Sequence, residues 1–429
     1  MWRALSPMRD FMRTETAGGV LLVSAALAAL VWANSPWKGS YESLWHSVIS
    51  IDIAGHELSL DLRHWLNDAA MAIFFLVVGL EIKREVTSGH LAGRRAATLP
   101  IAAAFGGMLV PALIYLAIAG GTNSQGWGVP MATDIALAVG VVTLAGDSVP
   151  ASLRAFLLGL AVVDDIGAIV VIAIFYSDGV SFAWLLVGVS SVVVTLLVRR
   201  SGLQLLPVYI ALGALLWFAL HEAGVHPTLA GVTMGLLTPV TPRRSPDLVD
   251  ADRLAMLPSV ENVRETMRSA KESVSTVEWL EYHLHPWTSF LIVPIFALAN
   301  SGVEVSVSSL EHALGSPITW GVFAGLIAGK PIGVLLTTRI AFATGAADRL
   351  SNVSRRQYIG AGHAAGIGFT VALFISELAF DDQRQVDDAK MAILTASILS
   401  GIVAFFVLRQ RPKAAAAAAT IAPSPVAVE

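Results

Sequence analysis

The sequence has no cysteine and little charge. Without cysteine among its 429 residues, the chain cannot form disulfides, use a thiolate nucleophile or bind zinc through sulfur. Charged residues make up 14% of the chain, against about 25% in a typical soluble domain. This is too little polar material to cover a water-facing surface, so we expect a membrane protein.

Hydrophobic residues make up 55% of the chain, and the mean hydropathy is +0.68. The apolar runs are much longer than the four to eight residues typical of a buried strand, and they reach the roughly 17 to 25 residues that a membrane-spanning helix needs. The sequence therefore predicts an all-α polytopic membrane protein with twelve transmembrane helices. The predicted spans are residues 17–35, 66–83, 96–119, 128–146, 153–176, 182–198, 204–221, 224–240, 287–303, 317–341, 357–379 and 389–408.

The basic residues are distributed very unevenly between the predicted loops. If the N-terminus is cytoplasmic, the loops and tails on that side hold most of the 28 lysines and arginines. The opposite loops hold only Lys38, Arg63 and Arg384. Because cytoplasmic loops carry an excess of lysine and arginine, both termini are predicted to be cytoplasmic.

Three segments outside the spans have their own character. Residues 48–63 alternate apolar and polar side chains around a central Ala-Gly, which predicts a β-hairpin outside the membrane. Residues 241–280 predict a long, partly helical loop. The alanine-rich tail 411–429 is predicted to be disordered, so the transporter domain should end near residue 410 in a single domain 1–410.

A few ionisable residues lie well inside the predicted spans: Asp68, Asp134, Asp164, Asp165 and Lys330. Such a charge costs at least about 2.5–3.5 kcal/mol at the membrane centre, so it needs a partner or a water-filled cavity. Charges near a span end more often snorkel to the interface, the expected behaviour of Lys390 and an alternative for Asp68. Asp164 and Asp165 are too central for that. As neighbours on a helix they project about 100° apart, so they should have different partners, and Lys330 is the obvious cation.

Two spans are interrupted by residues that disfavour a continuous helix. In "GVPMATDIALAVG", Pro130 precedes the oxygens of Thr133 and Asp134; in "GHAAGIGFTVALF", the interruptions are Gly366 and Gly368. Interrupted spans in corresponding positions of two halves point to a transporter site built from broken helices. Spans three to five and ten to twelve would then form two inverted-topology repeats.

The oxygen-rich set around the broken spans suits a small, hard cation. Carboxylates, a threonine hydroxyl and exposed carbonyls are hard ligands, and no soft ligand accompanies them. The two aspartates should titrate as a coupled pair. If that titration falls near physiological pH, protons and cations compete for the same oxygens, and alternating access turns competition into exchange.

Several motifs together resemble the NhaA-type sodium/proton antiporters of bacterial inner membranes. They are "FFLVVGLEIKREV", "MATDIALAVGV", "AVVDDIGAIVV", "GVHPTLAGVTMG", "LHPWTSFLIVPIFALANSGV", "GKPIG" and "GIGFTVALFI". The resemblance covers roughly residues 10–410. It implies electrogenic, pH-regulated exchange of cytoplasmic Na⁺ or Li⁺ for external H⁺ by alternating access. This family is itself one of the examples behind the inverted-repeat rule.

The resemblance also implies a fold and roles for individual residues. Spans four and eleven would be unwound and cross within a core bundle made of spans three to five and ten to twelve, and the other spans would form a second, interface bundle. Asp164 and Asp165 would carry the transported cation and the protons. Thr133 and Asp134 would lie at the crossing, Asp134 and Lys330 would compensate the half-helix dipoles, and Asp68 would line the pathway.

A separate set is implied to respond to pH: Glu81, Arg84, Glu85, His226 and Glu281. From the residues alone, a single histidine near the start of a span is more often a structural hydrogen-bonding group, so both interpretations of His226 stay open. Pro227 departs from the family pattern beside it. By resemblance only, the 48–63 hairpin is an expected homodimer contact.

Other functions fit the sequence less well. An intramembrane aspartyl protease needs a G-x-G-D motif and acids on separate helices, and the chain has no such motif. A Na⁺-coupled transporter of an organic anion would need more fixed cations than Lys330, and a channel would need a ring of acids or a filter loop. The sequence predicts no enzymatic activity, no cofactor and no nucleic-acid partner; the bilayer, Na⁺ or Li⁺, and H⁺ are the expected partners.

Overall fold

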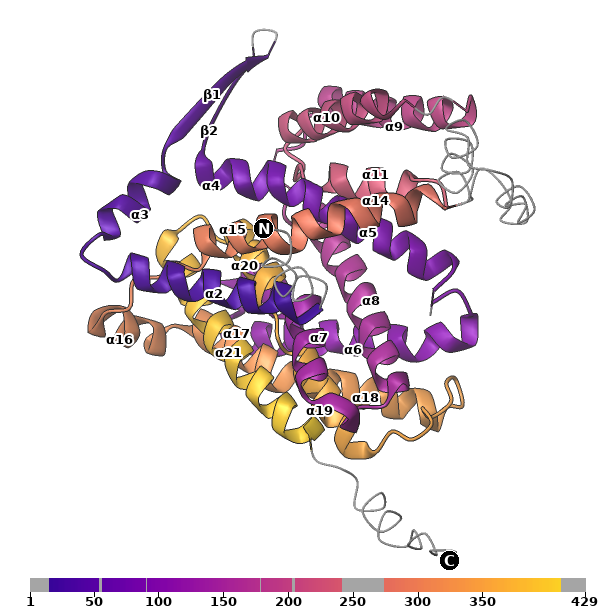
Figure 1. The fold of residues 1–429 in the computed structure, drawn as a ribbon. Helices are drawn as coiled ribbons and strands as arrows, with labels where there is room; N and C mark the ends of the chain where they lie inside the picture. The colour runs from indigo at the N-terminus through magenta and orange to yellow at the C-terminus, as the bar shows by residue number, and fades with distance from the viewer. Residues whose placement is uncertain are drawn as a thin grey trace, which may run out of the picture. The chain divides into compact units, whose positions relative to one another are not determined.

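The computed structural model describes residues 15–53, 56–89, 91–177, 179–202, 205–240 and 274–409, and these residues are largely helical (Figure 1). The turn of the predicted hairpin, residues 241–273 of the predicted loop and the predicted tail lie outside these ranges.

The described elements follow one another in this order: α2 (Glu15–Ala33), α3 (Lys38–Trp45), β1 (Val48–Ile53), β2 (His56–Asp61), α4 (Leu62–Trp65), η2 (Leu66–Ala70), α5 (Met71–Thr87), α6 (Arg94–Ala119), η3 (Ser124–Met131), α7 (Ile135–Leu144), η4 (Gly146–Ser148), α8 (Ala151–Phe175), α9 (Phe182–Arg200), α10 (Leu206–Glu222), α11 (Leu229–Leu237), α14 (Thr276–Trp287), η6 (Thr288–Ile292), α15 (Val293–Asn300), α16 (Val307–Gly315), α17 (Pro317–Ala324), η7 (Gly325–Gly329), α18 (Lys330–Ala343), α19 (Arg355–Ala365), α20 (Phe369–Ala379) and α21 (Gln383–Arg409). Of these, η3 and η4 are 3₁₀ helices, whereas η2, η6 and η7 are single π-helical turns within longer helices.

Seven helices in the described chain are long and apolar enough to cross a membrane, or nine if each of two bent pairs is one span. One bent pair is α19 with α20, at 44° to each other. Two of the other predicted spans correspond to shorter helices, because α10 has 17 residues and α11 has nine. The chain is a multi-pass membrane protein, and the count of twelve spans stays a prediction.

The chain divides into two compact units. Unit 1 combines the chain up to Val20 with Arg94–Ala168 and the part from Val305 onward; unit 2 comprises Leu21–Gly93 and Ile169–Glu304. The boundary within α8 falls just after the two adjacent aspartates. The inverted repeats, and the roles of core and interface bundle, stay predictions.

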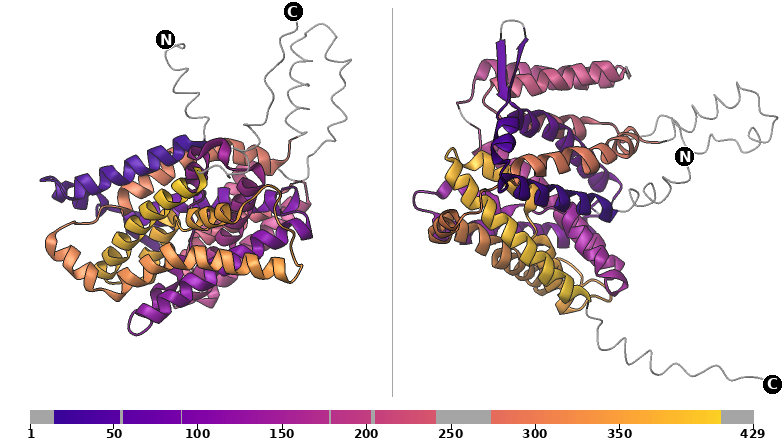
Figure 2. Two further views of the ribbon diagram at one scale, coloured as in Figure 1. Left: turned by 90° about the horizontal axis from the view of Figure 1, so that it is seen from below. Right: turned by 60° about the vertical axis from the view of Figure 1, so that its left-hand side comes forward.

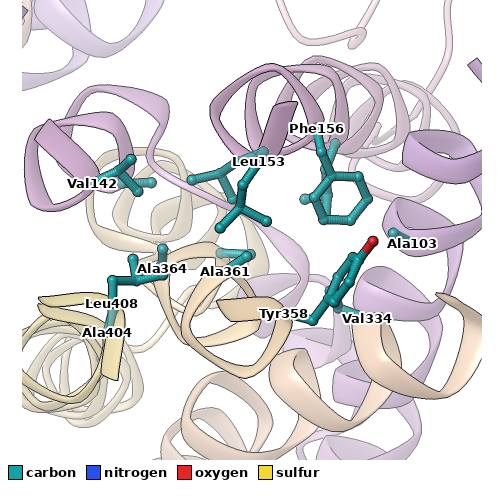
Figure 3. Packing of buried hydrophobic residues seen from close by; sticks show 14 of the residues in the cluster. Ala103, Val142, Leu153, Phe156, Val334, Tyr358, Ala361, Ala364, Ala404 and Leu408 are labelled. Carbon is teal, nitrogen blue, oxygen red and sulfur yellow. The ribbon is translucent and has the colours of Figure 1, made fainter. Parts of the chain in front are cut away.

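In unit 1, α6 packs against α17 and α18, and α21 packs against α17, α19 and α20 (Figures 1 and 2). An apolar cluster of this unit joins side chains from α6, α7, α8, α18, α19 and α21 (Figure 3). Phe156 and Tyr358 meet edge to face in it, with ring centroids 5.9 Å apart. Tight apolar packing of this kind fixes the helices that carry the polar residues described below.

The tenth predicted span packs closely because of its glycines, which the sequence spaces by four. A Cβ on Gly329 would lie 2.8 Å from the Cα of Pro111 in α6, and a Cβ on Gly333 would collide with the carbonyl oxygen of Gly106. Side chains are therefore excluded by the approach of the two backbones. This packing brings Lys330 against α6.

In unit 2, α5 packs against α11 and α14, and α10 packs against α9 and α11. Strands β1 and β2 pair antiparallel, with Val48 opposite Asp61 and Ser50 opposite Ser59. The hydroxyls of that serine pair are 2.9 Å apart. The Asp61 side chain ends the second strand by accepting a hydrogen bond from the backbone of His64, which caps α4.

Candidate functional site

The centre of unit 1 contains two helical breaks that are hydrogen-bonded to each other. The first is the extended stretch Ala132–Asp134 between η3 and α7; the second is Gly366–Gly368 between α19 and α20. The backbone N–H of Asp134 donates to the carbonyl of Ile367 at 2.6 Å. The two interruptions that the sequence indicated therefore meet, and each satisfies a backbone group that the other exposes.

The glycines of the second break are required by close contacts. A Cβ on Gly366 would lie 2.6 Å from the carbonyl oxygen of Leu326, and one on Gly368 would lie 3.0 Å from the Leu326 side chain. Both glycines have a negative φ, −73° at Gly366 and −89° at Gly368. The break is thus shaped by the nearby η7 turn and does not depend on an unusual glycine backbone.

Asp134 serves the N-termini of two half-helices at once. One carboxylate oxygen accepts from the backbone of Leu137 in α7 at 2.9 Å. The other accepts from the backbone and hydroxyl of Thr370 in α20, at 3.2 and 2.7 Å. With 2% of its surface exposed, this carboxylate satisfies orphan N–H groups where two helix dipoles are positive.

Thr133 contacts the C-terminal end of a half-helix, whereas Asp134 binds N-terminal ends. Its hydroxyl donates to the carbonyl of Ala365, the last residue of α19, at 2.8 Å. The same oxygen accepts from the ammonium of Lys330 at 2.8 Å. The positive charge of Lys330 therefore reaches the negative end of α19 through one hydroxyl.

Lys330 also binds one of the two adjacent aspartates. Its Nζ donates to Oδ2 of Asp164 at 2.5 Å, and both side chains are fully buried. The other oxygen of Asp164, Oδ1, is buried and accepts no hydrogen bond. Asp165 is 5% exposed and lies within electrostatic range of Lys330. The two aspartates thus have different surroundings, as helix geometry predicts.

These contacts bring together five of the residues selected from the sequence: Thr133, Asp134, Asp164, Asp165 and Lys330. If Asp164, Asp165 and Lys330 are all ionised, two carboxylates lie near one ammonium, and the excess negative charge favours a cation or protons. No group of three or more His, Asp or Glu side chains in the described ranges is arranged to hold a metal. A cation bound here would take hydroxyl or carbonyl oxygens in addition to the carboxylates, as Na⁺-like hard ions do.

Asp68 lies in unit 2, in the π turn η2. Its carboxylate is 9% exposed and lies 3.8 Å from Nδ1 of His221. Its backbone carbonyl accepts from the indole of Trp217 at 3.0 Å, and that indole stacks on His221. The sequence did not indicate these two partners, because they lie on a different helix, α10.

The five residues implied to respond to pH also lie in unit 2, but in two places. Arg84 and Glu281 form an ion pair of 2.5 Å between α5 and α14, and Glu81 and Glu85 lie within electrostatic range of it. His226, in the turn before α11, has His221 as its electrostatic neighbour.

One buried charge was misjudged from the sequence. Lys390 was expected to snorkel, but its side chain is 2% exposed and its ammonium lies 2.5 Å from the Glu377 carboxylate. The pair joins α20 to α21. An ammonium this deeply buried requires an anionic partner, and the presence of an acid in the neighbouring span was the available signal.

Comparison with known proteins identifies relatives along nearly the whole chain. The family model for "Na+/H+ antiporter 1" matches residues 9–408. The Na⁺/H⁺ antiporter NhaA of Oleidesulfovibrio alaskensis is 43% identical over 95% of this chain and 94% of its own length. The NhaA of Rhodopirellula baltica is 41% identical, with the same coverage.

A solved structure shares the fold. The sodium proton antiporter MjNhaP1 of Methanocaldococcus jannaschii superimposes with a TM-score of 0.52, covering 95% of this chain and 99% of its own, at 12% identity. The protease and organic-anion alternatives weighed from the sequence receive no support, because the relatives are named as antiporters. The resemblance drawn from the motifs is confirmed: the chain belongs to the NhaA family of Na⁺/H⁺ antiporters.

Proposed function

We propose that this protein exchanges cytoplasmic Na⁺ or Li⁺ for external H⁺ across a bacterial inner membrane, at the Asp164–Asp165 pair. The observation that carries the proposal is the buried ion pair between Lys330 and Asp164, 2.5 Å long, beside an Asp164 oxygen that accepts no hydrogen bond. That oxygen is a ligand position for a hard cation. The protein acts as a transporter, without a chemical step and without a cofactor.

Cation binding competes with the existing ion pair in this mechanism. A sodium ion on the Asp164 carboxylate places a second positive charge next to the Lys330 ammonium, so the ammonium must withdraw from the oxygen that it now holds. The Thr133 hydroxyl oxygen, which already accepts a hydrogen bond from the Lys330 ammonium at 2.8 Å, can still accept it after this withdrawal. When sodium leaves, the Asp164 carboxylate can pair with the ammonium again until it takes up a proton.

Charge counting gives an electrogenic cycle. With Asp164 and Asp165 ionised and Lys330 charged, the site carries one net negative charge, which one Na⁺ cancels. With both carboxylates protonated instead, the site carries one net positive charge. A cycle that moves one Na⁺ outward and two H⁺ inward therefore moves one positive charge inward.

Asp134 holds the broken helices in position through this cycle. Its contacts with Leu137 and Thr370 tie the N-termini of α7 and α20 to one carboxylate. We infer that the half-helices keep these bonds while access to the aspartates alternates. Asp68 is proposed to line the pathway in unit 2, and the Arg84–Glu281 pair with Glu81 and Glu85 to set the pH response. His226 is proposed to influence that response from its separate position beside His221.

The test is ion exchange in reconstituted vesicles containing a pH-sensitive dye. Asp164→Asn and Asp165→Asn should each abolish Na⁺-driven proton movement, because neither amide can carry a proton or balance the cation. Asp348→Asn is the matched control, since that acid is 75% exposed in a surface pair with Arg95. Normal exchange by both site variants, or no proton movement with a Na⁺ gradient in the wild type, would disprove the proposal.

A further inference from the structure

A short helix outside the predicted spans exposes a row of large apolar side chains. In α16, Val307, Leu310 and Leu314 are 77%, 49% and 55% exposed, and Ala313 is buried. Their spacing of three and four residues places the three exposed side chains on one face. Glu311 and His312 point elsewhere and line a surface cavity with Asp388.

Both ends of this nine-residue helix are fixed. At the start, the Ser306 hydroxyl accepts from the backbone of Ser309, and the Ser309 hydroxyl accepts from the backbone of Ser306. At the end, the indole of Trp320 donates to the carbonyl of Leu314 at 2.8 Å. A helix this short is marginal alone, so these caps hold its apolar face in a defined direction.

The span that follows α16 also exposes large apolar side chains. Trp320, in the first turn of that span, is 47% exposed, and Ile332 and Leu336 further along are about half exposed. On a helix long and apolar enough to cross a membrane, exposed side chains of this kind contact lipid. Tryptophan is also enriched where such a surface reaches the membrane–water interface.

We propose that α16 is an interfacial helix, with Val307, Leu310 and Leu314 inserted at the boundary between headgroups and acyl chains. The helix has one acid, Glu311, and no lysine or arginine. Its binding therefore depends on buried apolar area and does not require anionic lipid. By its direct connection to α17, it fixes the membrane depth at which the Lys330-bearing span begins. None of this depends on the proposed ion exchange.

The absence of native cysteine makes a labelling test direct. A nitroxide is attached to Leu310→Cys or Leu314→Cys in the full chain, reconstituted in nanodiscs of phosphatidylcholine alone or with phosphatidylglycerol. Its collision rates with oxygen, which concentrates in lipid, and with a water-soluble nickel chelate are measured. We expect oxygen to dominate several-fold at both positions, equally in both lipids. Ser308→Cys, exposed on another side of the helix, is the matched control and should favour nickel.

Three results would overturn the proposal. Nickel accessibility at Leu310→Cys and Leu314→Cys equal to that at Ser308→Cys would place the face in water. Protection from both reagents would show that a protein surface, such as a second copy of the chain, covers it. Oxygen dominance only with phosphatidylglycerol would show an anionic-lipid site. Circular dichroism and a melting curve for each variant establish that it folds before labelling.

Discussion

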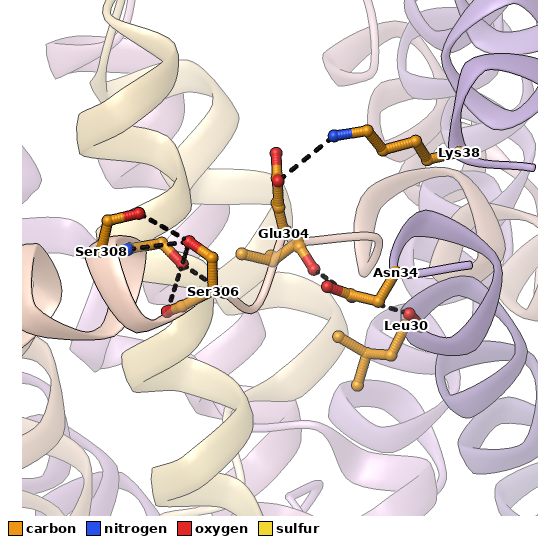
Figure 4. A network of polar contacts seen from close by, with 8 residues as sticks. Leu30, Asn34, Lys38, Glu304, Ser306 and Ser308 are labelled. Carbon is orange, nitrogen blue, oxygen red and sulfur yellow. Dashed lines mark hydrogen bonds and ion pairs between the residues drawn. The ribbon is translucent and has the colours of Figure 1, made fainter. Parts of the chain in front are cut away.

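Two lysine–carboxylate pairs in this molecule have the same chemistry and opposite surroundings. Lys330 and Asp164 are fully buried and 2.5 Å apart in unit 1. Lys38 and Glu304 are 3.3 Å apart in unit 2, with 54% and 60% of their side chains exposed (Figure 4). Water screens the second pair, so binding or losing an ion there changes little. In the first pair, each charge depends on the other, and a competing cation has a large effect.

A third lysine–carboxylate pair tests whether burial alone is enough to give such a pair a role in transport. Lys390 and Glu377 are 2.5 Å apart, with 2% and 17% of their side chains exposed, and this pair involves neither of the adjacent aspartates. If burial alone made a lysine–acid pair functional, this pair would behave like Lys330 and Asp164. If the neighbouring second acid and the helix break matter, it should only stabilise the fold.

The largest effect is expected for Lys330→Ala. It leaves Asp164 buried without its cation and removes a donor from Thr133. Breaking such a buried pair costs about 3–5 kcal/mol, or less if Asp164 takes up a proton instead. We expect a lower melting temperature and an altered pH dependence of exchange. The double variant Lys330→Ala with Asp164→Asn should recover part of the stability without recovering transport. Unchanged melting and an unchanged pH profile for the single variant would remove Lys330 from the mechanism.

Lys390→Met should have the next largest effect, and only on stability. The thioether fits an apolar neighbourhood, but Glu377 loses its cation. We expect a loss of about 1–3 kcal/mol, mostly recovered in Lys390→Met with Glu377→Gln. The number of protons per sodium, measured from the reversal potential in vesicles, should not change. A changed ratio would mean that this pair takes part in ion movement and would remove the distinction drawn above.

Arg84→Gln should alter regulation with a modest loss of stability, about 1 kcal/mol, since the Arg84 side chain is 37% exposed. Burial raises the pKa of Glu281 and the positive charge of the guanidinium lowers it, so that pKa rises further when the guanidinium is removed. The pH profile of exchange should therefore shift to higher pH while the maximal rate stays similar. Arg95→Gln, which breaks the exposed pair with Asp348, is the control. A profile that moves to lower pH, or does not move, would contradict the regulatory role.

The sequence predicted the members of the central site better than their contacts. Charges inside an apolar run are costly and therefore few, so Asp134, Asp164, Asp165 and Lys330 were easy to select. The acceptor on Ala365 was not predictable, because it is a backbone carbonyl and every residue has one.

Pairing between helices was the other limit. The burial of Lys390 could not be read from its own neighbourhood, since a lysine near the end of an apolar run looks the same whether it snorkels or meets an acid on the next helix. The span count has a similar cause: α11 has nine residues, but the apolar run 224–240 continues beyond both of its ends. Hydropathy records the composition of a segment and not how much of it is helical.

The smallest effect is expected for Lys38→Ala, which tests the exposed pair of the comparison. An exposed lysine–glutamate pair contributes about 0–1 kcal/mol, and salt at 0.15 M screens much of that. The melting temperature and the exchange rate should therefore match the wild type at physiological ionic strength, with at most a slight difference at low salt. Glu304→Gln should behave in the same way, because either change breaks the same pair. A clear loss of stability in both single variants, but not in their double combination, would show that this surface pair is coupled as strongly as a buried one, and exposure would then no longer explain the difference between Lys38 and Lys330.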